Sequence, residues 1–319
     1  MLIVNLMLIF LGFALLIKGA DFLVDGASNV AKKFNIPQIV IGLTIVAIGT
    51  SMPELVVSVT SALNGYSDMS IGNIVGSNIA NLFLILGICS IINPLIFKRE
   101  TRIFENPFTI FVTCLLLFLA NNGGNLTISR NEGIILLGFC ALFIIYNIVM
   151  AKKGNKFDGE EETKDKDISI LKSIVYIVIG IVGLKFGGDL VVNNAEVISK
   201  AVGISEKLIS LTIVAFSTSL PELITSMVAT KKGEVDMAIG NIIGSQIFNI
   251  LLIIGVSSIL TPINYSIEYN RYILLLVIGT ILFALYPYIG EKNKMTRSNG
   301  IIFVIIYAMY MASLVYFNI

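Results

Sequence analysis

The chain has 319 residues, of which 56% are hydrophobic and only 13% are charged, and its net charge is +1. Soluble domains carry about 25% charged residues, so this composition excludes an ordinary soluble protein. The sequence contains no histidine and shows no basic face, which excludes histidine-ligated zinc or haem, serine–histidine catalysis and nucleic-acid binding.

Hydrophobic runs long enough to cross a bilayer recur along the whole chain. The first is interpreted as a membrane span, because no charged n-region or small-residue cleavage site of a signal peptide accompanies it. The sequence predicts an all-α, polytopic membrane protein with ten transmembrane helices, over residues 3–24, 39–63, 70–92, 106–120, 131–151, 170–192, 207–230, 235–260, 271–289 and 298–317.

A strongly polar stretch, residues 152–169, separates the fifth span from the sixth and predicts a solvated cytoplasmic linker. It divides the chain into residues 1–151 and 170–319, with five spans each. Shifting the chain by 168 residues aligns 19–94 with 187–262 without a gap, and about 35 of the 76 pairs are identical. Because five is odd, the second copy enters the membrane from the opposite side. The chain is therefore predicted to consist of two inverted five-helix repeats.

Loop charges predict the orientation of these spans. The loops after spans 1, 3, 5, 7 and 9 carry most of the basic residues, and by the positive-inside rule they face the cytoplasm. We therefore expect a multi-pass protein of the plasma membrane with both termini outside. The basic residues of these loops include Lys32, Lys33, Lys98, Arg99, Arg102, Lys152, Lys153, Lys156, Lys231, Lys232, Lys292, Lys294 and Arg297, against Arg130, Lys200, Lys207 and Arg271 on the other side.

Two carboxylates, Glu54 and Glu222, occupy matched positions inside predicted spans. An ionised carboxylate in the membrane costs from about 2.5 kcal/mol upward, so such a residue normally faces a cavity or a cation. Each follows a proline, Pro53 or Pro221, which interrupts the helix and exposes backbone carbonyls. Hydroxyls precede each proline, in Thr50, Ser51, Thr218 and Ser219. These oxygen ligands suit calcium and sodium.

A second duplicated motif, GNxxGSxxxN, contains Asn73 and Asn241 and places Ser77 with Asn81, and Ser245 with Asn249, on one helix face each. The serines and terminal asparagines are predicted cation ligands, and the glycines of the motif a close helix contact. Two acids near the start of these spans, Asp68 and Asp236, are predicted N-caps. Another matched pair, Asp21 and Asp189, is either structural or part of an access path.

The sequences IGTSMPE with GNIVGSNIAN, and FSTSLPE with GNIIGSQIFN, resemble the two alpha-repeat motifs of the sodium/calcium exchangers in the cation/calcium antiporter superfamily. The resemblance covers nearly the whole chain. It implies an antiporter, not an enzyme, that needs no cofactor, typically moves three sodium ions against one calcium ion, and slides its first and sixth helices past the rest.

The resemblance also implies four cation positions between helices 2, 3, 7 and 8. Glu54 and Glu222 would be shared ligands, joined at the calcium position by the carbonyls of Thr50 and Thr218. Asn81 and Asn249 would flank the middle. The outer sodium positions would be completed by Ala47, Ser51, Ser77, Ala215, Ser219 and Ser245.

Two positions depart from the family pattern. Ser217 replaces a usual glycine, which stiffens the second helix break, and Asn249 stands where potassium-dependent relatives carry aspartate, which argues against potassium co-transport. A calcium/proton exchanger stays open as an alternative, because glutamates also carry protons. A passive cation channel is a more remote alternative, since inverted repeats with broken helices favour alternating access.

Overall fold

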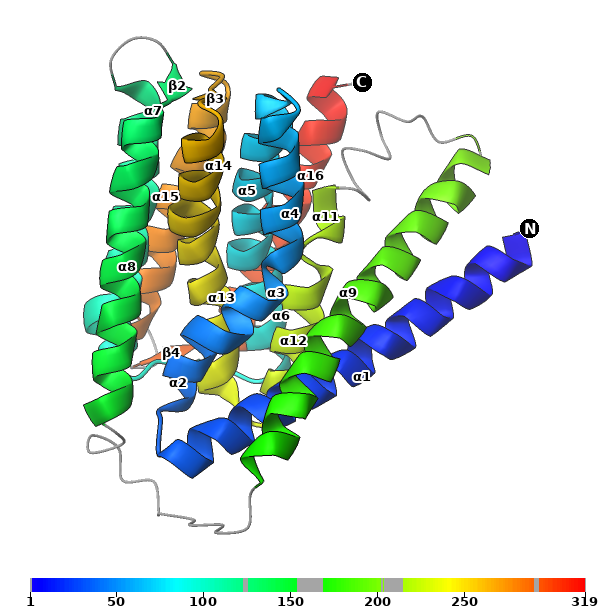
Figure 1. Cartoon of the computed structure of the whole chain (residues 1–319), viewed down its shortest axis with the longest axis vertical. Helices are drawn as coiled ribbons and strands as arrows, with labels where there is room; N and C mark the ends of the chain where they lie inside the picture. Colours follow the sequence, from blue (N-terminus) through cyan, green and yellow to red (C-terminus); the bar gives the residue numbers. More distant parts are fainter. Residues whose placement is uncertain are drawn as a thin grey trace.

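The computed structural model describes residues 2–122, 126–153, 169–201, 203, 215–289 and 293–318, the side chains of 153, 215, 317 and 318 excepted. The described chain is almost entirely helical, as predicted (Figure 1). The first half contains α1 (Leu2–Phe34), α2 (Gln38–Ile41), α3 (Ala47–Thr50), α4 (Met52–Leu63), α5 (Ser67–Ile79), α6 (Leu86–Ile92), α7 (Asn106–Asn121) and α8 (Arg130–Lys153). Three π-helical segments continue its helices: η1 (Gly42–Val46), η2 (Ala80–Ile85) and η3 (Thr101–Glu105).

The second half repeats this order. It contains α9 (Ile170–Ala201), α11 (Ala215–Ser217), α12 (Leu220–Lys231), α13 (Val235–Phe248), α14 (Gly255–Leu260), α15 (Tyr269–Leu285) and α16 (Arg297–Asn318). The π-helical segment η5 (Asn249–Ile254) joins α13 to α14, and the short 3₁₀ segment η6 (Tyr286–Tyr288) follows α15.

Within the described residues, eight helical stretches are long and apolar enough to cross a membrane, and the bent pair Gln38–Thr50 and Met52–Leu63 makes a ninth. The predicted span 207–230 begins outside the described residues and continues in α11 and α12. Two helices are longer than predicted: α1 reaches Phe34 instead of residue 24, and α9 reaches Ala201 instead of residue 192. The polar residues at these ends lower the hydrophobicity of the sequence without ending the helix.

Four two-residue strands, which the sequence did not predict, tie the halves together. β1 (Leu95–Ile96) pairs with β4 (Lys294–Met295), and β2 (Thr127–Ile128) pairs with β3 (Ile263–Asn264), both antiparallel. β1 and β3 lie 168 residues apart and so are equivalent in the repeat. They nevertheless lie at opposite ends of the bundle, β3 at the top of Figure 1 and β1 beside β4 at the bottom. The repeats are therefore inverted.

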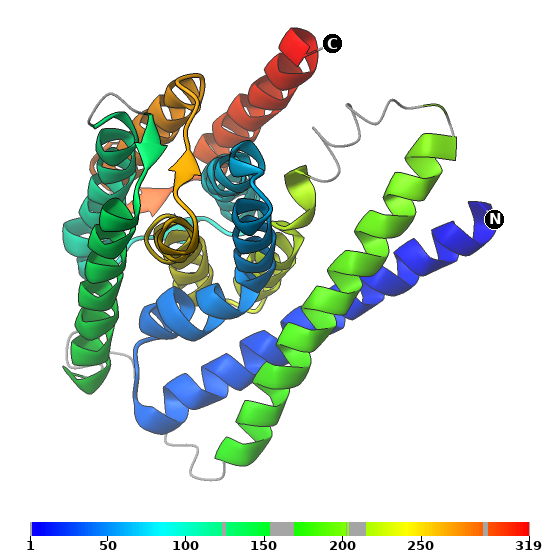
Figure 2. The ribbon, with the colours of Figure 1, turned by 45° about the horizontal axis from the view of Figure 1, so that its top comes forward.

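The helices α1 and α9 form a separate antiparallel pair along one side of the bundle. Their backbones approach closely where Gly12 meets Gly187 and where Gly19 meets Gly180. Seven residues separate successive contacts on each helix, which keeps the small residues on one seam. In both views this pair crosses the bundle at one end and leans away from it at the other (Figures 1 and 2).

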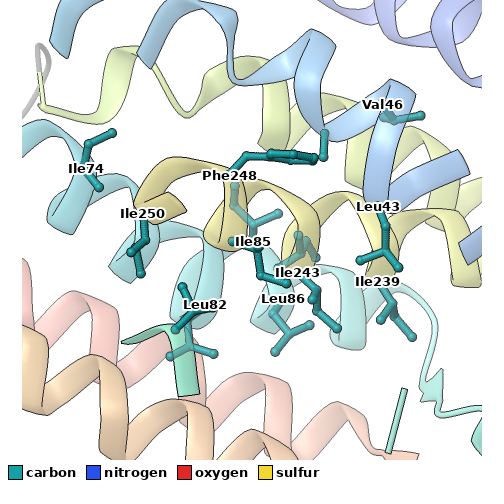
Figure 3. Packing of buried hydrophobic residues seen from close by; sticks show 14 of the residues in the cluster. Leu43, Val46, Ile74, Leu82, Ile85, Leu86, Ile239, Ile243, Phe248 and Ile250 are labelled. Carbon is teal, nitrogen blue, oxygen red and sulfur yellow. The ribbon is translucent and has the colours of Figure 1, made fainter. Parts of the chain in front are cut away.

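The core lies where α13 and the π-helical segments cross. Figure 3 shows Leu43 beside Ile239, and Ile243 beside Ile85 and Leu86. The crossing is close enough that a Cβ added at Gly240 would lie 2.5 Å from the Ile39 carbonyl oxygen. The predicted packing role of this glycine motif is thus seen in the second copy.

The acids that begin α5 and α13 do not cap them, contrary to the prediction. Tyr66 and Glu234 occupy the N-cap positions, and neither makes a side-chain capping bond. Asp68 and Asp236 lie in the first turn, where a negative charge is favoured by the helix dipole. Asp236 pairs with Lys98 at 3.0 Å, which joins the second half to the first.

Candidate functional site

The two proline motifs break their helices in the same way. Ser51 has φ −84° and ψ 8°, and Ser219 has φ −83° and ψ 0°. The two parts of the first broken helix bend by 49° at this residue. Glu54 and Glu222 follow in the first turns of α4 and α12. The matched dihedral angles show that the local sequence, TS(M/L)PE, sets the break.

The breaks leave backbone carbonyls free. Pro53 and Pro221 have no N–H to donate. Hydrogen bonding resumes only when Leu55 N–H reaches the Ser51 carbonyl at 3.1 Å and Leu223 N–H reaches the Ser219 carbonyl at 3.0 Å. Within the described part of the chain, no backbone amide donates to the carbonyl of Thr50 or Thr218. These two oxygens are available to a cation.

The two glutamates, one from each half, both accept hydrogen bonds from serines of the first half. Each carboxylate is fully buried, with 0% of the residue exposed. The Ser51 hydroxyl donates to Glu222 Oε1 at 2.9 Å, so a bond from the first break ends on the acid of the second. Ser77 donates to Glu54 Oε1 at 3.0 Å and also lies 2.9 Å from the Ser219 hydroxyl. The predicted residues Ser51, Glu54, Ser77, Ser219 and Glu222 are therefore brought together.

Threonines and asparagines form a matched pair of bridges around this centre. Thr50 Oγ1 donates to Asn241 Oδ1 at 3.1 Å, and Thr218 Oγ1 donates to Asn73 Oδ1 at 3.2 Å. Each asparagine in turn donates 2.9 Å bonds, Asn73 to Ser58 and Asn241 to Ser226. Sequence reasoning assigned Asn73 and Asn241 no role and missed both serines. Their signal was present, since each pair is separated by 168 residues in the duplication.

The two terminal asparagines of the motif lie on π-helical turns. Asn81 is in η2 and Asn249 begins η5, and such wide turns are frequent at functional sites. Asn249 Nδ2 donates to Asn78 Oδ1 at 2.9 Å, whereas Asn78 Nδ2 donates to the Gln246 carbonyl at 3.3 Å. The role of Asn78 in joining the halves was also missed, although it too aligns with a polar residue, Gln246.

Several buried polar atoms at this centre have no hydrogen-bond partner among the described residues. They are one carboxylate oxygen of each glutamate (Glu54 Oε2 and Glu222 Oε2), both amide atoms of Asn81, Asn249 Oδ1 and Ser245 Oγ. Leaving a buried acceptor unsatisfied costs about 1–3 kcal/mol, and more for a charged group. Carboxylate, amide, hydroxyl and carbonyl oxygens form a hard ligand set that suits sodium or calcium.

The two alanines were predicted to contribute only their backbone. Ala47 is buried at the start of α3, and its carbonyl accepts the Ser51 N–H at 3.0 Å and the Thr50 hydroxyl at 3.3 Å. Ala215 begins α11, and its side chain lies outside the described set. Their proposed sodium contacts stay predictions.

A third buried acid, Glu105, was not singled out from the sequence. It ends η3 at the start of the α7 span and accepts a 3.3 Å hydrogen bond from the Tyr146 hydroxyl of α8. The residue 168 positions later is Ile273, so the duplication does not repeat this acid. Its hydrogen-bond partner, Tyr146, lies outside the Glu54–Glu222 centre, so Glu105 can serve as a control for the loss of a buried acid.

The family model for "Sodium/calcium exchanger protein" matches residues 4–149 and 172–316. The chain belongs to the sodium/calcium exchanger family. It is a membrane transporter, not an enzyme. Its putative antiporter relative CaxA of Alkalimonas amylolytica is 36% identical over 95% of this chain and 96% of that protein. The inner membrane protein YrbG of Escherichia coli is 33% identical over 87% of each.

The fold also matches a solved member of the family. The sodium-calcium exchanger NCX_Mj, soaked with 2.5 mM Na⁺ and 0.1 mM Ca²⁺, superposes with a TM-score of 0.83 at 33% identity, over 98% of this chain and 99% of that one. The predicted family, and the architecture of two repeats with broken helices, are thereby confirmed.

Proposed function

We propose that this protein is a secondary active antiporter that exchanges sodium for calcium by alternating access. One observation carries the proposal: two fully buried glutamates, one from each half, accept hydrogen bonds from Ser77 and Ser51 of the first half, while one oxygen of each glutamate has no partner among the described residues. Two carboxylates supply a charge of −2, which one calcium ion balances. A site assembled from both repeats changes its access when the repeats rearrange.

The proposed role of each ligand depends on which of its oxygen atoms lacks a hydrogen-bond partner. Glu54 and Glu222 bind the ions directly, and the free carbonyls of Thr50 and Thr218 complete the calcium position. The unpartnered atoms of Asn81, Asn249 and Ser245 line the middle and one outer position. The remaining outer ligands are Ser51, Ser77 and Ser219 with the backbones of Ala47 and Ala215.

The exchange is electrogenic. With three sodium ions moved against one calcium ion, one positive charge crosses per cycle. The neutral Asn249 leaves only the two glutamates charged, which supports a cycle without potassium.

The protein resides in the plasma membrane with both termini outside. The distribution of lysine and arginine between the loops supports this orientation. A relative that is an inner membrane protein supports the location. Residues 1–151 and 170–319 are the two functional halves, joined by the cytoplasmic linker 152–169.

Calcium flux into liposomes tests the proposal. Purified protein is reconstituted in sodium-loaded vesicles, which are diluted into sodium-free buffer or into equal sodium with radiolabelled calcium outside. We expect uptake only with the outward sodium gradient, and at least a hundredfold loss in Glu54→Gln and in Glu222→Gln, because each removes a charged ligand worth several kcal/mol. Glu105→Gln, which removes a buried acid bonded to Tyr146, keeps the uptake.

Two other outcomes contradict the proposal. Uptake driven by a pH gradient without sodium indicates a calcium/proton exchanger. Uptake that is indifferent to both gradients indicates a channel. Equal loss in Glu105→Gln and Glu54→Gln would show that any buried acid is needed for folding, and the assigned site would lose its support.

A further inference from the structure

One lysine joins the α1–α9 pair to the rest of the bundle. Lys232, the C-cap residue directly after α12, lies 2.7 Å from Asp25 Oδ1 and 3.3 Å from Asp21 Oδ1 of α1. Its ammonium also donates to the Asp21 carbonyl oxygen at 3.3 Å. The Lys232 side chain is 31% exposed, so the cluster is only partly screened by solvent. The ammonium therefore contacts three oxygen atoms of α1.

The duplication provides an internal comparison, because residues 168 apart are equivalent. The residue equivalent to Lys232 is Asn64, the C-cap residue directly after α4. The equivalent of Asp25 is Asn193, and that of Asp21 is Asp189, which pairs with Lys185 of its own helix at 2.7 Å. At these equivalent positions, the ionic link between a long helix and the bundle is therefore present in one copy of the repeat and absent from the other.

The packing of the two long helices on the bundle shows the same asymmetry between the repeats. α1 packs along α12, at the end that carries Lys232. The symmetry-equivalent pair is α9 with α4, and these two helices do not pack in a comparable way in the residues that the structure describes. Figures 1 and 2 show the other ends of α1 and α9 leaning away from the bundle. The conformation is thus closed at the Lys232 end.

From these two asymmetries we infer that Lys232, with Asp21 and Asp25, is an electrostatic latch that holds α1 on α12 and biases the protein toward the conformation closed at that end. This inference rests on the proposed alternating access. In the opposite conformation, α1 leaves α12 and α9 closes on α4, where the neutral Asn64 and Asn193 provide no equivalent link. The latch therefore gives the two conformations different free energies, although the repeats are similar in sequence.

The expected size of the effect is modest. Partly exposed ion pairs contribute little each, so removing the ammonium shifts the ratio of the two conformations by about two- to fivefold. The shift must also depend on ionic strength, because the Debye length falls from about 30 Å at 0.01 M to about 3 Å at 1 M salt.

A distance measurement between spin labels tests the latch without using transport. Labels are placed on Leu63 of α4 and Val197 of α9, both exposed, in a Cys114→Ser background whose other cysteines, Cys89 and Cys140, are buried. Double electron–electron resonance in liposomes then measures the distribution of distances between the two labels. A long distance reports the conformation in which the ends of α4 and α9 are apart, and a short distance reports the one in which they are together. We expect Lys232→Gln to raise the population with the ends together by about two- to fivefold.

Three controls sharpen the measurement. Lys232→Arg retains the cation and is expected to keep the wild-type distribution. Lys185→Gln breaks the pair within α9 and is expected to change nothing. Choline chloride is expected to shift the wild type toward the Lys232→Gln distribution and to leave that variant unchanged.

Equal distributions in the wild type and in Lys232→Gln, with two populations present, would overturn the latch and leave the antiporter proposal intact. A single distance in sodium, in calcium and in choline would overturn alternating access and, with it, the latch.

Discussion

The hydroxyl of Ser51 donates a 2.9 Å hydrogen bond to the carboxylate of Glu222, although 171 residues separate them. The helix break of one repeat is thereby tied to the acid of the other. A rearrangement of the halves must disturb this bond, so under the proposed function this contact couples ion binding to conformation.

Replacing Ser51 by alanine should weaken ion binding at Glu222. A hydrogen bond to a charged group contributes about 1.5–3 kcal/mol, so we expect the apparent calcium affinity to fall by about tenfold or more. Calcium uptake into sodium-loaded liposomes, measured against calcium concentration, checks this. Ser313→Ala, which removes a bond to the Tyr310 carbonyl on α16, should leave the affinity unchanged. Equal affinities in Ser51→Ala and the wild type would contradict the role of this bond.

The bridges of Asn73 and Asn241 should stabilise the two halves equally. Each asparagine accepts from a threonine of the other half and donates to a serine of its own. Alanine at either position leaves two buried hydroxyls without these partners, and we expect a loss of about 1–3 kcal/mol in each case. Thermal unfolding in detergent measures this loss. A large effect in only one of the variants would show that the bridges are not equivalent.

The crossing at Gly240 should not accept a side chain. The added Cβ of Gly240→Ala would lie 2.5 Å from the Ile39 carbonyl oxygen and 2.9 Å from the Leu43 amide nitrogen. Overpacking of this kind costs about 1–3 kcal/mol, so the unfolding temperature should fall. Gly138→Ala in α8, where an added Cβ meets nothing within 4 Å, should be neutral or slightly stabilising. If both variants unfold at the same temperature, the helices do not cross as closely at Gly240 as the structure indicates.

Calcium uptake should respond to voltage with a definite sign. Three sodium ions leaving for one calcium ion entering carry one net positive charge outward, so a positive interior should accelerate uptake. Each 100 mV is worth about 2.3 kcal/mol per charge, and about 60 mV should therefore change the final calcium gradient tenfold. Valinomycin with high external potassium sets the voltage. No response would indicate two sodium ions per calcium ion.

Much of the fold could be predicted because a membrane restricts the choices. Backbone groups in lipid must be bonded within the helix, so long apolar runs specify spans. The ends of α1 and α9 could not be predicted, since helices continue beyond the bilayer where their polar residues meet water. The four short strands, such as β1 with β4, lacked a pattern of their own because two residues show no periodicity.

The residues of the candidate site could be predicted from the sequence, but the hydrogen bonds between them could not. The matched positions of Glu54 and Glu222, and of Ser77 and Ser245, are visible from the duplication alone. Duplication suggests equal bonding in both copies. In the structure Ser77 bonds to Glu54, whereas Ser245 Oγ has no partner among the described residues. The copies differ because their halves are not arranged alike at the two ends.

The sequence by itself determined the spans, the duplication, the helix breaks and the identity of the paired polar residues. These depend on local composition and spacing, which the membrane makes decisive. Only the tertiary structure decided that Ser51 reaches Glu222, that Asn241 bridges Thr50 and Ser226, and that Lys232 holds α1 at one end. Such contacts depend on how two similar halves pack against each other, and a repeat in sequence leaves that arrangement open.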